Sequence, residues 1–209
     1  MLRQALDVEV VGVMVTINET FDRVAMHGVR RSLVDAQARA AQLPLHVVPI
    51  PHPCPNETYE VRMAAFIADA KAAGVEAIAF GDLFLEDIRA YRESQLAGTG
   101  ITPLFPLWGR DTAALAREMI TCGLEARIVC VDPQRLDRSF AGRAFDDLLL
   151  SDLPAGVDPC GENGEFHTFA HAGPTFTEPI LIVAGEIVQR DEFVFADFAQ
   201  PTGRFLARL

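Results

Sequence analysis

The sequence predicts an α/β protein built on an open parallel sheet, and two observations carry this prediction. First, apolar segments rich in β-branched residues alternate five times with segments that have helical spacing. Second, half of the 209 residues are hydrophobic, so the chain can bury a sizeable core. Such alternation is typical of β-α-β units with parallel strands. We therefore expect ligands to bind at the carboxyl ends of these strands.

The predicted strands are short apolar segments. Residues 8–17 (VEVVGVMVTI) are almost wholly apolar and suit a strand that is covered on both faces. Four more strands are predicted after it, at residues 45–50, 75–80, 101–106 and 125–131. The C-terminal part resembles a hairpin, with candidate strands at residues 180–183 and 185–190 and one more strand or a docked tail within residues 191–209.

The predicted helices lie between these strands. Residues 28–42 place apolar side chains on one face and are followed by Pro44, a typical stop signal. The next helix runs from Thr58 to about residue 73 and ends at Gly74. Further helices are predicted at residues 83–96 and from Asp111 or Thr112 to residue 121, and mixed helix and turn at residues 135–150.

Composition excludes several classes of function. The net charge is −11, with 29 acidic against 18 basic residues, so general binding to nucleic acid or to an anionic membrane is not expected. No apolar run approaches the roughly 18 residues of a membrane span, and the first residues lack the pattern of a signal peptide. The cysteines at positions 54, 122, 130 and 160 show no C-x-x-C spacing. We expect reduced thiols and a cytoplasmic protein.

One stretch concentrates the residues that can carry chemistry, residues 158–169 (DPCGENGEFHTF). Its carboxylates, Glu162 and Glu165, lie in a turn-prone segment, and Gly161 and Gly164 permit positive φ and a close approach of the backbone to a ligand. The other reading is a polar hairpin turn that leads into an edge strand, because Gly, Asn and acidic residues are common in turns.

Two further reactive side chains flank the carboxylates. Cys160 precedes them, and His167 follows them where side chains alternate as in a short strand. No metal site is expected, because His52 and Cys54 have no second pair of ligands. The sequence also contains no Gly-x-Ser-x-Gly, Gly-x-Gly-x-x-Gly or Gly-x-x-x-x-Gly-Lys-Ser/Thr motif.

The ends of two predicted strands carry other candidates. Asp82, after Gly81, is predicted either to face the crevice at the strand end or to cap the next helix. His27 precedes a helix, where it is predicted to meet an anionic group or to act as a cap or a surface residue. Arg89 and Arg92 form either a phosphate clamp or an ordinary exposed helix face.

These motifs together resemble a known family. The matching residues are Met-His-Gly-Val-Arg at 26–30, Gly-Asp at 81–82 with Arg-x-x-Arg-Glu at 89–93, and Pro-Leu-Trp at 106–108. The match continues with residues 160–169 and Gly-Pro-Thr-Phe at 173–176. The sequence is similar to the diphthine–ammonia ligase family of N-type (PP-loop) ATP pyrophosphatases over residues 8–182.

The resemblance implies a fold and a reaction. The implied fold is an adenine-nucleotide α-hydrolase-like (HUP) α/β domain at residues 1–133, followed by a smaller substrate-side domain at residues 134–209. The implied reaction is ATP-dependent amidation, in which a carboxylate is activated as an acyl-adenylate and attacked by ammonia. In eukaryotic and archaeal members the carboxylate belongs to diphthine on elongation factor 2.

The resemblance also assigns roles to residues. Glu162, Glu165 and His167 are expected to be catalytic, and Gly81, Asp82 and His27 to bind the nucleotide with Mg²⁺. The residues expected to bind the substrate are Arg89, Glu93, Cys160, Gly161 and Gly164.

One expected element is missing from the sequence. The family begins with a strand and a Ser-Gly-Gly-Lys-Asp-Ser loop that cradles the phosphates of ATP, and no such loop occurs here. We expect a shortened N-terminus, with a central strand of the sheet absent and an exposed edge that could promote homo-oligomers. The main prediction is an amide-forming ligase that acts on a small or protein-borne carboxylate. The alternatives are a binding module without turnover and another reaction of the superfamily, such as tRNA thiolation.

Overall fold

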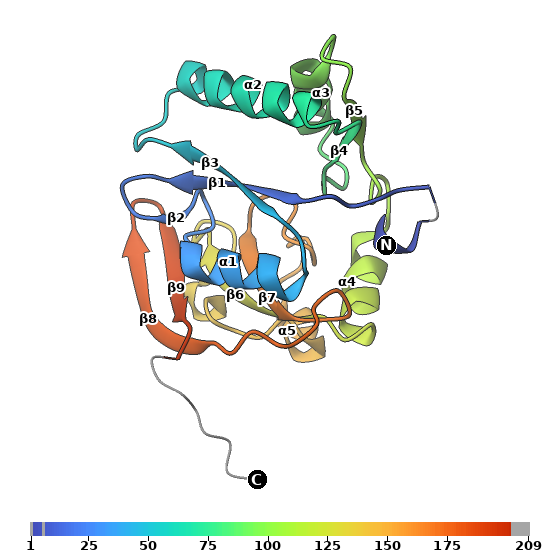
Figure 1. Cartoon of the computed structure of the whole chain (residues 1–209). Helices are drawn as coiled ribbons and strands as arrows, with labels where there is room; N and C mark the ends of the chain where they lie inside the picture. Colours follow the sequence, from blue (N-terminus) through green and yellow to red (C-terminus); the bar gives the residue numbers. More distant parts are fainter. Residues whose placement is uncertain (1, 6, 202–209) are drawn as a thin grey trace.

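The computed structural model describes residues 2–5 and 7–201 of the chain (Figure 1). The N-terminal half contains β1 (Val13–Asn18), β2 (Arg23–Val24), α1 (Arg31–Ala40), β3 (Leu45–Ile50), α2 (Asn56–Ala72), β4 (Ala77–Ala79), α3 (Glu86–Leu96) and β5 (Thr102–Leu104). The C-terminal half contains α4 (Thr112–Thr121), β6 (Glu125–Val131), α5 (Asp147–Asp152), β7 (Phe166–Ala172), β8 (Val183–Arg190) and β9 (Phe193–Ala199). Short 3-10 turns lie at Leu2–Gln4 and Arg138–Phe140.

The strands form three sheets. One has the order β2-β1-β3, a second pairs β4 with β5, and a third has the order β7-β6-β9-β8. The β1–β3 and β4–β5 pairs are parallel, as predicted, whereas β6 pairs antiparallel with both β7 and β9. The chain is therefore α/β, with parallel and antiparallel parts.

The prediction of one open parallel sheet is wrong for its last strand. Across the described residues, β4 forms no ladder with β1, so the parallel strands are divided between two sheets, as expected if a central strand is absent between them. The segment at residues 125–131 is a strand as predicted, but it joins the antiparallel sheet. Five of its seven residues are buried, and a strand covered on both faces shows the same apolar run in either kind of sheet. The HUP topology and the domain division at residue 133 stay predictions.

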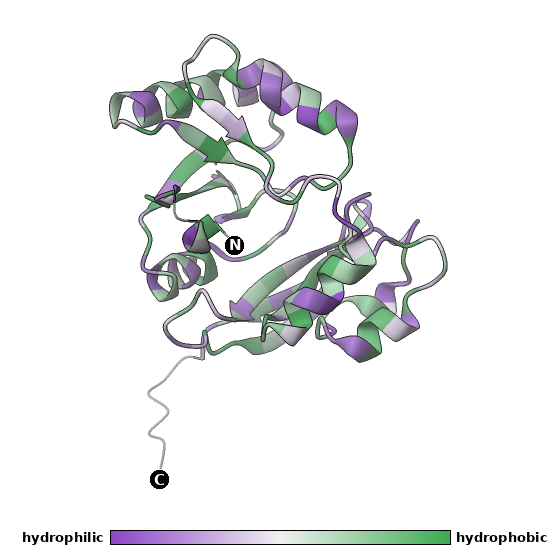
Figure 2. Cartoon of the chain, turned by 90° about the vertical axis from the view of Figure 1, so that its right-hand side faces the viewer, coloured by the Kyte–Doolittle hydropathy of each residue, from purple (hydrophilic) through white to green (hydrophobic). Residues whose placement is uncertain are grey.

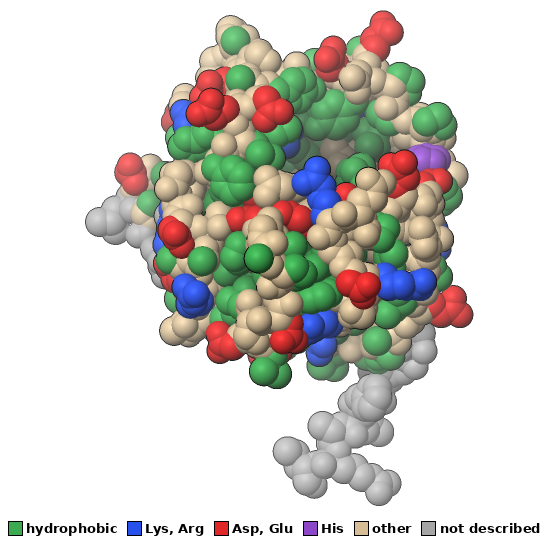
Figure 3. Space-filling model, turned by 180° about the vertical axis from the view of Figure 1, so that it is seen from behind, with side chains coloured by type: hydrophobic (Ala, Val, Ile, Leu, Met, Phe, Trp, Pro, Cys, Tyr) green, Lys and Arg blue, Asp and Glu red, His purple; other side chains and the backbone are tan. Residues whose placement is uncertain are grey.

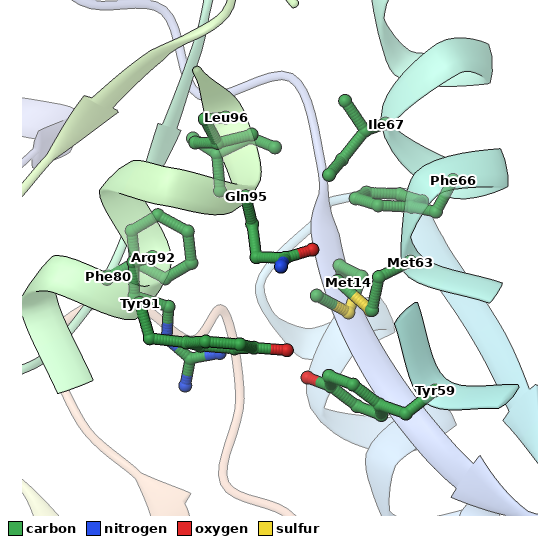
Figure 4. Close-up of a pocket in the computed structure, with 11 residues that line it drawn as sticks. Met14, Tyr59, Met63, Phe66, Ile67, Phe80, Tyr91, Arg92, Gln95 and Leu96 are labelled. Atoms are coloured by element: carbon green, nitrogen blue, oxygen red, sulfur yellow. The ribbon is translucent and has the colours of Figure 1, made fainter. Parts of the chain in front are cut away.

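The space between β1 and β4 is bordered by apolar side chains. Met14 of β1, Phe80 after β4, and residues of α2 and α3 line a small cavity of about 20 Å³ (Figure 4). The side chains of Tyr59 and Tyr91 reach toward each other across it, and the amide of Gln95 points into it. A volume of this size holds about one water molecule, so the cavity itself is no site for a larger ligand.

The main core lies between α1 and the antiparallel sheet. Leu33 of α1, Ile128 and Val131 of β6, and Val194 of β9 have at most 1% of their surface exposed. Val15 of β1 also packs against this core. In Figure 2 the interior strands are largely hydrophobic, whereas the outer helices mix hydrophilic and hydrophobic residues.

An ion-pair cluster joins the two halves of the chain. Asp197 of β9 accepts hydrogen bonds from Arg23 Nη1 at 2.9 Å and from Arg30 Nε at 3.0 Å. Beside it, Gly28 has φ +70°, and an added Cβ would lie 2.6 Å from the ring of Phe195. The loop between β2 and α1 is thus fitted closely against β9.

Two further predictions concern the ends of the chain and the membrane. Within the described residues, no helix is long and apolar enough to cross a bilayer. The predicted last strand corresponds to β9, while residues 202–209 of that predicted segment lie outside the described residues.

Candidate functional site

Three loops meet at Leu83, just after β4. The backbone N–H of Leu83 donates to Glu162 Oε1 at 2.7 Å, and its carbonyl oxygen accepts from the N–H of Gly109 at 2.8 Å. Leu83 is 4% exposed. The acidic loop is therefore tied to the loops that follow β4 and β5, at the carboxyl ends of these parallel strands, where α/β sheets bind ligands.

The face opposite to that of Figure 1 is hollowed. Figure 3 shows a depression lined mainly by hydrophobic side chains, with basic and acidic side chains near its rim. Charged groups at the rim of an apolar depression are a common arrangement for a small-ligand site.

The acidic loop is shaped by its own backbone hydrogen bonds. Asp158, which is 9% exposed, accepts hydrogen bonds at Oδ1 from the N–H groups of Cys160 at 2.8 Å and Glu162 at 3.2 Å. Gly161 has φ +71°, and a Cβ there would lie 2.5 Å from the carbonyl oxygen of Phe166. Only glycine fits this position, because a side chain would meet rigid backbone. Gly164 has φ +83°, with open space where a Cβ would be.

Glu165 is a buried carboxylate that keeps one oxygen without a partner. It is 3% exposed. Its Oε1 accepts from the N–H of Asp158 and from Asn163 Nδ2, both at 3.0 Å. Its Oε2 is buried and has no hydrogen-bond partner among the described residues. Burying a charged oxygen without a partner is costly, which makes this atom a candidate to receive a cationic or proton-bearing group.

His167 lies on β7, where it stacks on His27. The two rings are nearly parallel, at an interplanar angle of 12°, and their centroids are 4.2 Å apart. Burial, and secondarily the neighbouring His167, lower the pKa of His27 to about 4. Burial also lowers the pKa of His167. Both imidazoles are therefore neutral near pH 7.

His27 does not cap α1, which was the alternative prediction for this residue. The N-cap residue of α1 is Arg30, three residues later, and it makes no side-chain cap hydrogen bond. The sequence thus located His27 correctly before a helix, but its partner His167 comes from a strand 140 positions along the chain, which local pattern cannot reveal.

Cys160 is placed as a packing residue. Its Sγ lies 3.4 Å from the carbonyl oxygen of Thr112, at the start of α4. Burial, together with the nearby Asp158 and Glu162, raises the pKa of the Cys160 thiol to about 12. Such a thiol is not a nucleophile at neutral pH.

Asp82 faces Arg92, not the N-terminus of α3. Its Oδ2 lies 3.8 Å from Arg92 Nε, and each of these two buried atoms has no hydrogen-bond partner among the described residues. The N-cap residue of α3 is Leu85. Gly81 is exposed, with no atom near the place where a Cβ would be, so its backbone is open to a ligand.

Arg89 lies between two aromatic rings. Its guanidinium carbon is 4.8 Å from the ring centroid of Phe105 and 4.7 Å from that of Trp108. Its Nε donates to Glu93 Oε1 at 2.8 Å. The predicted pair Arg89 and Glu93 therefore does come together, one helical turn apart on α3, and the aromatic side chains come from the loop after β5.

Sequence reasoning missed several residues of this site. Phe105 was predicted only as part of a strand, and Trp108 only as part of the Pro-Leu-Trp motif. Leu83 acts through its backbone, which a sequence motif does not indicate. The hydrogen bonds by which Asp158 shapes the loop could have been predicted, because an Asp-Pro-x-Gly segment is typical of a turn organised by the aspartate side chain. The described residues contain no group of three or more His, Cys, Asp or Glu that could hold a metal ion.

Comparison with known proteins finds similarity to one family. The family profile described as "Diphthamide synthase C-terminal domain" matches residues 111–199, which include the acidic loop and the antiparallel sheet. The zebrafish (Danio rerio) protein named diphthine–ammonia ligase is 35% identical over 130 residues, covering 58% of this chain and 50% of that protein. The human protein of the same name is 32% identical over 130 residues, covering 60% of this chain and 49% of that protein.

The chain is thus similar to proteins named diphthine–ammonia ligase. A third relative, the cattle (Bos taurus) diphthine–ammonia ligase, is 26% identical over 197 residues and covers 87% of this chain and 74% of that protein. The similarity to this family member thus extends well beyond residues 111–199. The chain spans about half the length of the zebrafish and human ligases that it matches.

Proposed function

We propose that this chain carries the acceptor side of an ATP-dependent amide-forming ligase. A carboxylate of the substrate attacks the α-phosphorus of ATP, which forms an acyl-adenylate and releases pyrophosphate. Ammonia then attacks the acyl carbon, so that an amide forms and AMP leaves with a proton. The proposal is supported by the names of the relatives, which are diphthine–ammonia ligases.

The observation that carries the proposal is the hydrogen bond from the Leu83 N–H to Glu162. It fastens the acidic loop to the carboxyl ends of β4 and β5, so the carboxylates and the loops of the parallel strands share one site. In this proposal Glu162 is a positioning residue, because its Oε1 is already used by backbone N–H groups. The acceptor carboxylate and ammonia meet beside it.

Glu165 and His167 are proposed to bind ammonium and to take up its proton. Ammonia is mostly ammonium near pH 7 and reacts only after it has lost a proton. A buried carboxylate with a free oxygen attracts ammonium. In this proposal the proton passes to the imidazole of His167, which is uncharged in the free site because burial lowers its pKa.

ATP is proposed to lie against the loop after β4. The open backbone at Gly81 allows its close approach. Mg²⁺ usually needs only one or two protein carboxylates when it is bound through phosphates, and Asp82 is the carboxylate available at this place. The ion would neutralise phosphate charge there.

A second candidate function is favoured by a sequence observation. The second candidate is a module that binds a nucleotide or acceptor without turnover, and the 209 residues contain no Ser-Gly-Gly-Lys-Asp-Ser motif. Calorimetry with ATP, combined with carboxylate-dependent ATP–pyrophosphate exchange, distinguishes the two functions. Exchange supports the ligase, ATP binding without exchange supports the binding module, and the absence of both contradicts the proposed activity.

A further inference from the structure

We infer that Arg89 is the binding site for the carboxylate of the acceptor, held ready by Phe105, Trp108 and Glu93. The inference rests on the proposed function, because a carboxylate ligand is expected here only if the acceptor binds at this end of the sheet. Beyond the expectation that Arg89 and Glu93 bind the substrate, it names the substrate group that Arg89 holds and the two aromatic residues that position the guanidinium.

The first argument is that the guanidinium of Arg89 is fixed before any ligand arrives. The rings of Phe105 and Trp108 meet at 69° with centroids 6.1 Å apart, and the guanidinium carbon lies within 4.8 Å of both centroids. Each ring attracts the cation through its negative face. The Nε bond to Glu93 then fixes the remaining rotation of the side chain.

The second argument is that the ligand-binding end of this guanidinium is unused. Among the described residues, Arg89 makes its hydrogen bond through Nε alone, and its side chain is 36% exposed. The two Nη atoms remain as a planar pair of donors. This fork matches the two oxygens of a carboxylate, and a rigid fork loses less entropy when it binds than a flexible lysine does.

The third argument is location. Phe105 and Trp108 belong to the loop after β5, and Gly109 of the same loop bonds to Leu83. Leu83 also bonds to Glu162. The loop that carries the two rings over Arg89 and the acidic loop therefore both bond to the backbone of Leu83, as expected if one side holds the carboxylate and the other serves the nitrogen that attacks it.

The charges near Arg89 favour a carboxylate over a phosphate of the nucleotide. Glu93 already offsets the charge of Arg89, and the exposed acids Glu86 and Asp87 lie on the same helix. A polyanionic triphosphate is repelled by these acids, whereas a singly charged carboxylate is repelled less.

The experiment uses Trp108, which is the only tryptophan of the chain, as the reporter. Its fluorescence is followed in the whole protein at low, constant ionic strength, without ATP, while acetate, glycine betaine or inorganic phosphate is added. We expect saturable changes with acetate and betaine. Arg89→Gln should raise their Kd by about ten-fold or more, and Arg89→Lys by less, because lysine keeps the charge and loses the fork.

Two more variants make the result specific. Phe105→Leu keeps the reporter, removes one ring and should raise the Kd several-fold. Arg117→Gln, at an exposed position of α4, should leave the Kd unchanged. The urea midpoint of each variant separates lost binding from lost folding.

Three outcomes would overturn the inference. They are an unchanged Kd in folded Arg89→Gln, no response of the wild type to acetate or betaine, and Arg89-dependent binding of phosphate alone. The last outcome would assign the residue to the nucleotide. Binding is measured without turnover, so the two proposals can fail separately. If ATP–pyrophosphate exchange fails while betaine still binds, the proposed activity is contradicted and the binding site at Arg89 is not.

Discussion

At the scale of single residues, the acidic loop combines positions that sequence reasoning could find with contacts that it could not. Glu162, Glu165 and the two glycines were predicted from composition and local pattern. That Glu162 caps backbone N–H groups after β4 depends on a contact between positions 79 residues apart. The stacking of His27 on His167 is equally non-local. Local pattern therefore identified candidate residues but not their partners.

The two glycines of the acidic loop are predicted to differ in their tolerance of alanine. Gly161→Ala should destabilise the protein by at least about 2 kcal/mol, because a left-handed backbone is combined with a contact on the Phe166 carbonyl oxygen. Gly164→Ala should cost only the backbone strain, about 1–2 kcal/mol. Urea unfolding of both variants checks this, and equal losses would show that the contact at Gly161 is relieved by movement.

The buried histidines are predicted to make stability fall in mild acid. The pKa of His27 is about 4 when folded and 6.5 when unfolded, so the unfolded state binds more protons between these values. The stabilisation is complete above pH 6.5 and is lost as the pH falls toward 4, by about 3 kcal/mol.

Urea unfolding at a series of pH values measures this loss. His27→Gln should flatten the curve between pH 6.5 and 4, whereas His46→Gln, at an exposed position, should leave it as in the wild type. A wild-type curve that is flat in this window would contradict the burial of the pair.

At the scale of elements, the sequence predicted most helices and strands but not how the strands pair. The segments at residues 45–50 and 125–131 match β3 and β6, and Asp111 caps α4 by accepting from the N–H of Ala114 at 2.7 Å. The two-residue strand β2 was missed because it is too short to show a pattern. The pairing of β6 with later strands depends on tertiary contacts, and an apolar run does not predict which strands will pair.

The tie between the acidic loop and β4 is predicted to protect one amide. In Glu162→Ala the N–H of Leu83 should exchange with solvent about ten-fold faster or more, since a charge-assisted hydrogen bond is lost. Glu186→Gln, on the exposed strand β8, is the matched control. Hydrogen exchange followed by NMR reads out this amide. Exchange at the wild-type rate in Glu162→Ala would mean that the loop is held by other contacts.

At the scale of the whole molecule, the parallel strands and the antiparallel sheet are joined by side chains as well as by the core. Asp197 links β9 to Arg23 and Arg30 on the other half. Sequence reasoning predicted an α/β chain with a different C-terminal part and missed this cluster. Asp197 lies 167 and 174 residues from its two arginines, and the motif at residues 26–30 that contains Arg30 does not indicate this partner.

This cluster is predicted to set the acid limit of stability. Burial raises the pKa of Asp197, but the hydrogen bonds from Arg30 and Arg23 outweigh burial and lower it to about 2. The stabilisation is present above pH 4 and is lost as the pH falls toward 2, by about 2 kcal/mol. Asp197→Asn should remove this acid-dependent part and lower stability at pH 7. An unchanged urea midpoint at pH 7 would show that the halves hold together without the cluster.

The central claim is that the acidic loop and the loops of the parallel strands form one amide-forming site. The most direct test is carboxylate-dependent ATP–pyrophosphate exchange and amide formation in the wild type and in the double variant Glu162→Gln, Glu165→Gln, with ATP binding measured alongside. We predict that the wild type is active and that the double variant loses turnover while it still binds ATP. Unchanged turnover in the double variant would contradict the claim, because it would remove both carboxylates from the site.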